Sequence, residues 1–414
     1  MPFQKGQLLM RRFKGGWKPA SHATEDLPSS CFDNLPIELL HTITSLLDDN
    51  ELCLFRLSCK RIYESTRRHF ACAFFQTLHT DLSLTQLERS RAISADLELA
   101  PHVRTLVVRV LPDRVFGEGL SWSRHSFGYL LPEQSVQQWT EILRRLVNCT
   151  TFQLIRHGWS DKDEDLDRFT PTDAITMILH TVIEARIPVR EFLVDFKHPN
   201  STGANELDVR RINVPDLQMP GFIAAWANLQ VLQLNFTMDP TMITDWVDPL
   251  VRHASSLRKL TIQFDLGSEA EAIIERLSSI DPPSQLQELT LQSASEISGG
   301  RLRDLLYRHR DSLRVLDIKF IRLKDSDWKS IFGALGEFSL LESFNFSFLK
   351  EEHYVHFPIA SENLVTDGAT KFTFRPKRLG GRSINTSVSC WGPSAKVTLQ
   401  KLAESMELAS YLRR

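Results

Sequence analysis

The sequence predicts an α/β protein in which a short helical module precedes a solenoid with parallel strands inside and helices outside. Three observations indicate this architecture. Apolar residues between positions 35 and 57 recur with the period of an α-helix. From residue 229 onward, a short apolar frame returns every 27 to 29 residues. Segments with helical periodicity fill the intervals between its copies, so strand and helix alternate.

The composition is that of an ordinary globular chain. Its 414 residues are 42% apolar and 24% charged, and the formal net charge is −2. These values allow a sizeable core and provide no basic excess for nucleic acid. No apolar run reaches the length needed to span a bilayer, the six cysteines lack paired spacing, and no apolar signal segment begins the chain. We therefore expect reduced thiols, a cytoplasmic and/or nuclear location, and neither nucleic acid nor membrane as a partner.

Residues 1–30 are expected to form a flexible tail. Five basic residues precede the first acidic residue, Glu25, in this stretch. A targeting or nuclear signal is the alternative interpretation of the same charges.

Residues 31–75 are predicted to form three short helices. Asp33 or Asn34 can cap the first helix, and Pro36 then occupies a position where a missing backbone N–H costs little. Asp48-Asp49-Asn50 offers new caps, and a basic third helix begins at about Ser58. A unit of about 40 residues cannot enclose all of its apolar side chains, so some are expected to face a partner. These side chains are Leu39, Leu40, Ile43, Leu46 and Leu47 in a first stripe, and Leu52, Leu54, Phe55 and Leu57 in a second cluster.

This module resembles an F-box. The resemblance is carried by Leu35-Pro36-Ile37-Glu38-Leu39-Leu40 and by Arg56-Leu57-Ser58-Cys59-Lys60-Arg61, and it covers residues 35–70. It implies a docking module for a Skp-family adaptor and, through that adaptor, for a cullin in a ubiquitin ligase. A plain helical cap on the following domain is the alternative. The resemblance further implies that the adaptor contacts Leu35, Pro36, Leu39, Ile43, Leu46, Leu54 and Leu57, with Glu38 at the rim of the contact.

An apolar-x-x-apolar-x-apolar frame is repeated in the second half of the chain. Its spacing resembles that of leucine-rich repeats, which implies units of one strand and one helix that stack their strands in parallel. Weaker copies begin at Val103, Cys149 and Val189, about 40 residues apart, so insertions are expected there. The strong copies begin at Leu229, Leu257, Leu286, Leu313 and Leu341, and helices are expected over residues 242–254, 269–280, 302–309 and 328–338.

One face of these strands is apolar because alternate side chains share a face. A phenylalanine closes this face in several repeats, which predicts an aromatic column in the core. The same spacing argues against an aromatic cofactor box, and we expect no cofactor. The column is expected to contain Phe196, Phe236, Phe264, Phe320 and Phe348.

The opposite strand face carries amides, hydroxyls and few charges. Such groups exchange hydrogen bonds with a polypeptide at a lower desolvation cost than full charges do. We therefore expect this face to bind a protein substrate, and a merely solvated sheet face is the alternative. The candidate residues are Gln233, Asn235, Thr261, Gln263, Thr290, Gln292, Asp317, Lys319 and Asn345.

The turns after these strands depart from the leucine-rich-repeat pattern. That family usually places Asn or Cys there, where the side chain satisfies backbone groups. Because this chain lacks that ladder, irregular turns are expected. The corresponding residues here are Thr237, Asp265, Ala294, Ile321 and Leu349.

Catalytic and metal-binding motifs fail on spacing. Residues 161–167 begin like a calcium loop, but Leu166 and Thr172 stand where such a loop needs Gly and a bidentate Glu. Gly380-Gly381, flanked by basic residues, lacks the spacing of a phosphate-binding loop. No His-x-x-x-His or Cys-x-x-Cys pair and no Gly-x-Ser-x-Gly nucleophile elbow occur. The protein is therefore expected to be no enzyme and to hold no metal.

The expected organisation is a tail at 1–30, an F-box at 31–75, a helical connection at 76–100, a repeat array at 101–350 and a C-terminal extension at 351–414. Residues 351–392 are expected to be extended or loop. Ser394 can cap a last helix that carries Leu399, Leu402 and Met406 on one face. This organisation predicts a non-catalytic substrate-recognition subunit of a Skp–cullin–F-box ubiquitin ligase. A leucine-rich-repeat scaffold outside any ligase is the alternative.

Overall fold

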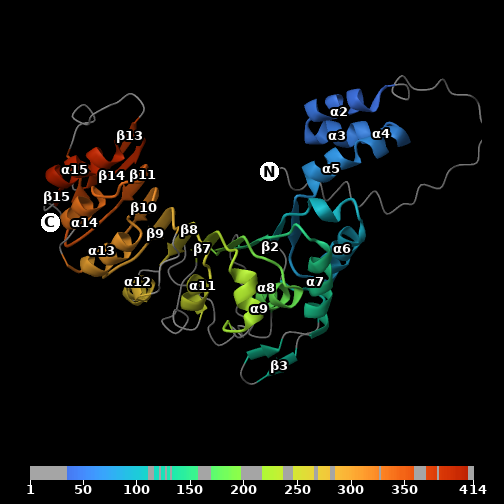
Figure 1. Cartoon of the computed structure of the whole chain (residues 1–414), viewed down its shortest axis with the longest axis horizontal. Helices are drawn as coiled ribbons and strands as arrows, with labels where there is room; N and C mark the ends of the chain where they lie inside the picture. The colour runs from blue at the N-terminus through green and yellow to red at the C-terminus, as the bar shows by residue number, and fades with distance from the viewer. Residues whose placement is uncertain are drawn as a thin grey trace, which may run out of the picture. The chain divides into compact units, whose positions relative to one another are not determined.

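A computed structural model describes residues 35–110, 116–120, 123–125, 128–130, 133–156, 169–196, 217–235, 246–264, 269–279, 285–325, 328–358, 370–379 and 382–408. The chain divides into two compact units, Met1–Ala73 and Phe74–Arg414 (Figure 1).

The described part of the first unit consists of short helices. They are α2 (Ile37–Leu46), α3 (Asp49–Arg56), α4 (Lys60–Ser65) and α5 (Arg67–Phe74), the last of which ends at the boundary. Four helices are thus seen where three were expected. Helix α2 starts behind Pro36, which forms no side-chain cap, and Asp33 and Asn34 lie outside the described residues.

Helix α3 begins in a capping box, as the run Asp48-Asp49-Asn50 predicted. The Asp48 carboxylate accepts hydrogen bonds from the backbone N–H groups of Asn50 and Glu51, both at 2.8 Å. The Glu51 carboxylate in turn accepts from the Asp48 N–H at 2.9 Å. These bonds satisfy backbone donors that a helix start otherwise leaves unpaired.

An arginine lies in the interior of the first unit. Arg56 is only 6% exposed, in a unit that also buries Leu40, Leu52 and Ile62. Its guanidinium donates to the Tyr63 carbonyl at 3.1 Å and to Thr66 Oγ1 at 3.2 Å. Burial lowers the pKa of this guanidinium, but an arginine stays charged even so.

In the described part of the second unit, eleven strands form one sheet. Their order is β1-β2-β5-β6-β7-β8-β9-β10-β11-β14-β13. All neighbours up to β11 are parallel, whereas β14 runs antiparallel to both β11 and β13. The bounds are β1 (Thr77–Thr80), β2 (Thr105–Val110), β5 (Thr151–Arg156), β6 (Glu191–Asp195), β7 (Val231–Asn235), β8 (Lys259–Gln263), β9 (Glu288–Gln292), β10 (Val315–Lys319), β11 (Ser343–Ser347), β13 (Lys371–Leu379) and β14 (Arg382–Trp391).

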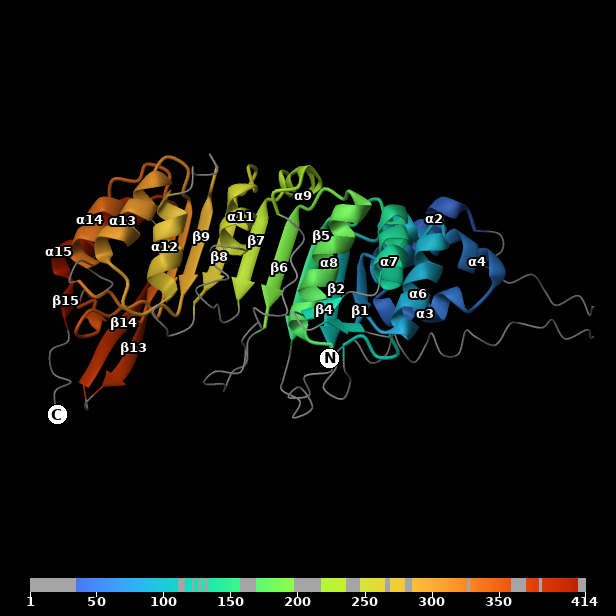
Figure 2. The same cartoon turned by 90° about the horizontal axis from the view of Figure 1, so that it is seen from below.

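Helices connect the parallel strands and lie along one face of the sheet (Figure 2). Consecutive helices pack side by side from α6 to α9 and from α11 to α15. The helices are α6 (Leu84–Ala95), η2 (Ala100–His102), α7 (Glu133–Arg145), α8 (Pro171–Ala185), α9 (Pro220–Trp226), α11 (Asp248–Arg252), α12 (Glu269–Ser279), α13 (Gly299–Arg308), α14 (Trp328–Leu335) and α15 (Ala395–Ser405). Two small two-stranded sheets pair β3 (Ser123–His125) with β4 (Gly128–Leu130) and β12 (Val355–His356) with β15 (Glu407–Leu408).

The repeated frame fixes the register of the parallel strands. Leu260 pairs with Leu289, which pairs with Leu316 on the next strand. The second and fourth residues of these strands are buried, and the first, third and fifth lie on the other face. The predicted α/β architecture with parallel strands and alternating helices is therefore confirmed.

The phenylalanine column is only partly correct. Phe196 and Phe264 are buried as expected, and Phe236 lies outside the described residues. Phe320, in contrast, is 50% exposed, and Phe348 is half-buried. Both have a φ of +55°, in the left-handed region, which turns the side chain away from the alternation of the strand. Such a conformation costs a bulky residue about 1 kcal/mol or more.

The turns after β9, β10 and β11 are regular, contrary to expectation. Ser293, Phe320 and Phe348 occupy the same position and share a positive φ. Their N–H groups donate to carbonyls of the next strand, at Lys319, Ser347 and Thr386, over 2.8 to 2.9 Å. Backbone groups thereby replace the missing asparagine ladder. The residues that follow, Ala294, Ile321 and Leu349, are buried, while Thr237 and Asp265 lie outside the described residues.

The C-terminal part forms a hairpin and a helix. Strands β13 and β14 extend the sheet, so residues 371–379 and 382–391 are extended, as expected, but they also enter the main sheet. Helix α15 packs against α14 and β14 and buries Leu399 and Leu402, whereas Met406 is half-buried at its end. Ser394 precedes this helix without a side-chain cap. At the other end of the sheet, the expected helical connection at 76–100 contains strand β1 as well as α6.

Candidate functional sites

The first candidate site is an exposed apolar stripe on the first unit. Leu46 and Leu54 are 80% and 69% exposed, and Leu39 and Leu57 are about half exposed or more. Pro36 and Glu38 are also exposed, while Leu35 and Ile43 are half-buried. All eight residues predicted for the adaptor contact therefore have some accessible surface.

Helix α2 has apolar residues on two faces. Leu40 and Thr44, one turn apart, are buried, and the Thr44 hydroxyl donates to the Leu40 carbonyl at 2.6 Å. Leu39 and Leu46 lie on the opposite side and are exposed. The predicted first stripe therefore divides into an inward set and an outward set.

Two exposed apolar residues were missed in the prediction. Ile37 is 48% exposed beside Pro36, and Tyr63 is 44% exposed on α4. The Arg61 side chain donates to the Leu35 carbonyl at 2.6 Å, which fastens the start of α2 to α4. The full outward set is Ile37, Leu39, Leu46, Leu54, Leu57 and Tyr63, which we call the leucine stripe.

The chemistry of the leucine stripe is that of a protein-binding surface. Burying one large aliphatic side chain contributes about 1.5 to 3 kcal/mol. A small unit that leaves several leucines in water forgoes this free energy unless a partner covers them, and such exposed apolar surfaces mark interaction sites.

The second candidate site is the open face of the large sheet, opposite the helices. Gln233, Thr261, Thr290, Asp317 and Asn345 lie in register on neighbouring strands, from β7 to β11. Asn235, Gln263, Gln292 and Lys319 form the adjacent column in the same way. The structure thus brings all nine predicted residues together on one face.

Two of these nine residues are not accessible. Asn235 is 3% exposed and Thr261 9% exposed. The Asn235 amide lies 3.5 Å from the Asp195 carboxylate of the preceding strand. The accessible part of the face is therefore mainly on β9 to β11.

Hydrogen bonds tie the polar groups of this face together. Asp317 accepts from the Asn345 amide at 3.0 Å and pairs with Lys319 at 2.6 Å. The Ser347 hydroxyl donates to the Asn345 amide oxygen at 3.4 Å. The two charges neutralise each other, so this part of the face is polar with little net charge.

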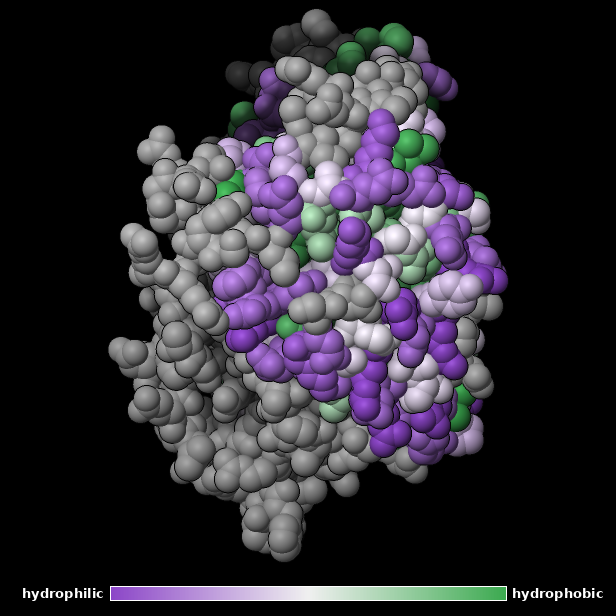
Figure 3. Space-filling model, turned by 90° about the vertical axis from the view of Figure 1, so that its left-hand side faces the viewer, coloured by the Kyte–Doolittle hydropathy of each residue, from purple (hydrophilic) through white to green (hydrophobic). Residues whose placement is uncertain are grey.

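The open face continues onto the C-terminal hairpin, which was not foreseen. Ser389 and Thr373 follow Asn345 in register, and Trp391 lies beside Ser343. Trp391 is 60% exposed. Figure 3 views this end of the second unit, where the described surface is mostly hydrophilic with small apolar patches. The sequence predicted only an extended or loop segment over residues 351–392 and did not indicate its neighbour in the sheet.

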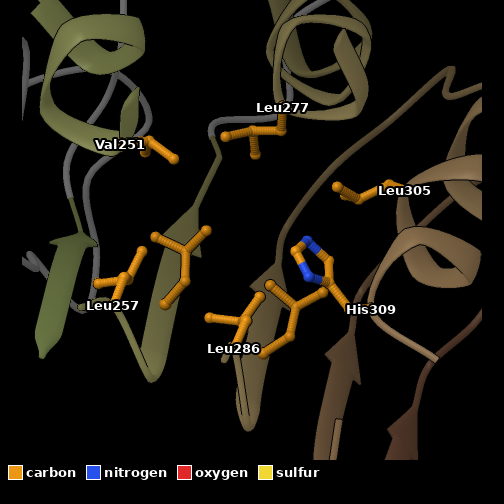
Figure 4. A pocket seen from close by; sticks show the side chains of 8 residues that line it. Val251, Leu257, Leu277, Leu286, Leu305 and His309 are labelled. Atoms are coloured by element: carbon orange, nitrogen blue, oxygen red, sulfur yellow. The ribbon is translucent and has the colours of Figure 1, made fainter. Parts of the chain in front are cut away.

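An interior cavity lies between strands β8 and β9 and helices α11 to α13 (Figure 4). Its volume of about 10 Å³ has room for roughly a single water. Burial among these leucines lowers the pKa of His309 to about 4, so this imidazole is neutral at pH 7. The cavity is too small to hold a substrate. It is lined by Val251, Leu257, Leu260, Leu277, Leu286, Leu289, Leu305 and His309.

Other functional groups do not gather in the described parts of the chain. No three His, Cys, Asp or Glu side chains in these parts are placed to hold a metal ion, and the acidic segment 161–167 lies outside them. No described helix is both long and apolar enough to cross a membrane.

Comparison with known families identifies the first unit. Residues 32–69 match the F-box domain family, and this range includes every residue of the leucine stripe. The chain therefore contains an F-box domain, which supports binding to a Skp-type adaptor of a ubiquitin ligase. A comparison with curated proteins finds no match.

Proposed function

We propose that this chain is the substrate-recognition subunit of a Skp–cullin–F-box ubiquitin ligase. The observation that supports it best is the leucine stripe, which lies within the F-box domain and is exposed. F-box proteins are generally non-catalytic subunits, so the chain would hold two proteins together and leave the chemistry to other subunits.

The adaptor would cover the leucine stripe. Leu39, Leu46 and Leu54 offer aliphatic anchors, and Glu38 lies at the edge with a charge that water can still reach. Buried anchors of this type contribute about 2 kcal/mol each at an interface, and the charges around them mainly set orientation. Leu35, Pro36, Ile43 and Leu57 would complete the contact.

The sheet would hold the substrate. Its strands repeat at regular spacing, and the accessible open face presents amides, hydroxyls and a neutralised ion pair, which supports a leucine-rich-repeat-like array that binds protein. The candidate contacts that keep accessible surface are Gln233, Gln263, Thr290, Gln292, Asp317, Lys319 and Asn345. Specificity would lie in these side chains and not in the fold itself.

The test is adaptor capture by the full-length chain. Leu46→Asp combined with Leu54→Asp places two charges on the leucine stripe without touching a buried residue. We expect adaptor affinity to fall about 100-fold or more, since each anchor contributes about 2 kcal/mol. Leu97→Asp is the matched control, because Leu97 is an 89% exposed leucine outside the F-box.

The outcome separates ligase subunit from scaffold. If the unaltered chain captures no adaptor, a scaffold outside any ligase becomes the better proposal. If the double variant captures as much adaptor as the Leu97→Asp variant, the adaptor does not use the leucine stripe.

A further inference from the structure

Two phenylalanine rings lie at the carboxyl end of the open face. Phe320 follows β10 and Phe348 follows β11, and their rings stack with centres 4.8 Å apart and planes 7° apart. Half of the Phe320 surface is exposed. The pair therefore presents an aromatic platform to solvent, although either ring alone would gain from burial.

The turn itself does not require phenylalanine. Ser293 occupies the same position in the turn after β9, with a φ of +63° and the same backbone bond to the next strand. Bulky residues are strained in this region, so neither backbone geometry nor core packing explains the two rings. Strained, exposed aromatic residues are features that point to binding.

Two cations follow the platform closely along the chain. Arg322 and Lys350 follow the two phenylalanines by two residues and pair with each other in register. Arg322 is bridged to Glu296 at 3.3 Å, and the Lys350 ammonium lies 5.4 Å from the centre of the Tyr354 ring. Glu296 thus partly balances Arg322, whereas Glu351 and Glu352 follow Lys350 in the sequence and the Glu351 carboxylate is buried, where it accepts from the Trp328 N–H.

The adjoining hairpin adds more positive charge. Residues 371–391 include five Lys and Arg residues and no Asp or Glu. Arg375 is exposed on β13 and pairs with Ser387, which lies opposite Ser347 at the carboxyl end of β11, whereas Lys371 is exposed at the other end of that strand. The pairing of β11 with β14 ends at Ser347 and Ser387, so the rest of the hairpin extends past the carboxyl end of β11 (Figure 2). Phe348 donates its N–H to Thr386 of this hairpin, which places the platform beside it.

We propose that this rim binds an acidic segment of a partner protein that carries one large apolar side chain. The apolar side chain would lie on the Phe320 ring, and the carboxylates would face Arg322, Lys350 and the hairpin. The inference rests on the proposed function, because the partner would be the substrate that the ligase modifies.

A polypeptide fits this rim better than nucleic acid does. In the described part of the chain, the cations that follow the rings by two residues are only Arg322 and Lys350, and Glu296 balances part of the first charge. A polyphosphate backbone gains affinity from several unpaired cations in a row. A mixed apolar and acidic segment needs only a few, together with an aromatic surface.

The experiment measures fluorescence anisotropy of labelled peptides with the full-length chain. The probe has a single leucine flanked on both sides by Asp and Glu. One control peptide replaces the leucine by Ser, and the other replaces the acids by Asn and Gln. We expect the probe to bind and each control to bind about tenfold more weakly or worse.

The protein variants replace each phenylalanine by the residue that occupies the equivalent turn after β9. Phe320→Ser with Phe348→Ser copies the residue found at position 293, so the turns are expected to stay folded. Probe affinity should fall at least about tenfold in this double variant and in Arg375→Glu. Ser293→Ala is the control and should bind the probe like the unaltered chain. Circular dichroism checks that the variants are folded.

Several results would overturn the proposal. They are no probe binding at up to about 1 mM, unchanged binding in the folded double serine variant, tighter binding of a single-stranded oligonucleotide, or self-association that the serine variant abolishes. The last result would indicate a second copy of this chain as the occupant. Adaptor capture by the same preparations tests the ligase proposal separately, so a rim that fails while the adaptor still binds overturns only this inference.

Discussion

The guanidinium carbon of Arg56 lies 4.1 Å from the centre of the Phe70 ring. The Tyr63 ring is 4.4 Å from the same carbon. With its bonds to the Tyr63 carbonyl and the Thr66 hydroxyl, this buried cation joins α3, α4 and α5. A charge in so small a core is tolerated because aromatic faces and oxygen acceptors replace its water.

Arg56→Ala should destabilise the F-box by about 2 to 3 kcal/mol, because it removes two hydrogen bonds and the contact with the rings. Arg56→Lys should recover little, since an ammonium lacks the planar fork. Urea unfolding of the full-length chain, followed with a probe in the first unit, measures the change. Arg68→Ala is the control, because Arg68 is exposed. Equal midpoints for the Arg56→Ala and Arg68→Ala variants would contradict the proposed role.

Phe264 and Phe320 hold equivalent sequence positions but should respond differently to the same change. Phe264→Ser empties a buried site and should cost about 3 kcal/mol or more. Phe320→Ser changes a half-exposed ring and should cost less than about 1 kcal/mol. Chemical denaturation of the two variants measures both values. Similar losses would mean that Phe320 is part of the core.

Acid should weaken the second unit through His309. Its pKa is about 4 in the folded protein, against an ordinary value of 6.5, because burial disfavours the charged form. The unfolded chain therefore binds more protons between these values, and stability falls as pH drops from about 6.5 towards 4. His79 has a pKa lowered to about 4 for the same reason and acts in the same direction.

The urea midpoint at pH 7 and at pH 5 measures this effect. In the His309→Leu variant, the fall between the two pH values should be smaller, because one imidazole with a lowered pKa is gone. An unchanged fall would show that folding does not lower the pKa of His309.

Helix α15 should be required for the stability of the sheet at its C-terminal end, where it packs against α14 and β14. Leu399 is fully buried and Val397, on the same helix, is 42% exposed. Leu399→Asp should destabilise the second unit by about 3 kcal/mol or more, whereas Val397→Asp should cost less than about 1 kcal/mol. Truncation at Pro393 should reduce solubility, which centrifugation of the expressed protein measures. A truncated chain that stays as soluble as the full one would contradict a capping role.

Packing explains why much of the architecture could be predicted. Leu260, Leu289 and Leu316 must recur at one spacing because they fill the same layer under the helices, and the sequence therefore shows the register directly. Asp48 and Glu51 cap α3 through hydrogen bonds between residues close in sequence, so this cap can also be predicted from the sequence.

Long-range contacts explain what could not be predicted. Phe320 matches the spacing of Phe264, but its left-handed conformation depends on a bond to the Ser347 carbonyl of another strand. The hairpin β13–β14 alternates like a strand, yet its antiparallel place beside β11 is set by tertiary pairing.

Helix α2 shows the same limit in the candidate site. Leu39 and Leu40 are neighbours of the same type, and only the packing of α2 against α4 decides which one is buried. The number of apolar residues indicated that some must face outward. The sequence pattern did not identify Ile37 and Tyr63 as members of the outward set.

Hydrogen–deuterium exchange of the full-length chain, with and without a purified Skp-type adaptor, tests the central claim most directly. If the adaptor covers the leucine stripe, amides of residues 37–65 should exchange more slowly in the complex, while those of β8 to β11 stay unchanged. Protection confined to the sheet, or no protection of α2 and α3 despite complex formation, would contradict the account.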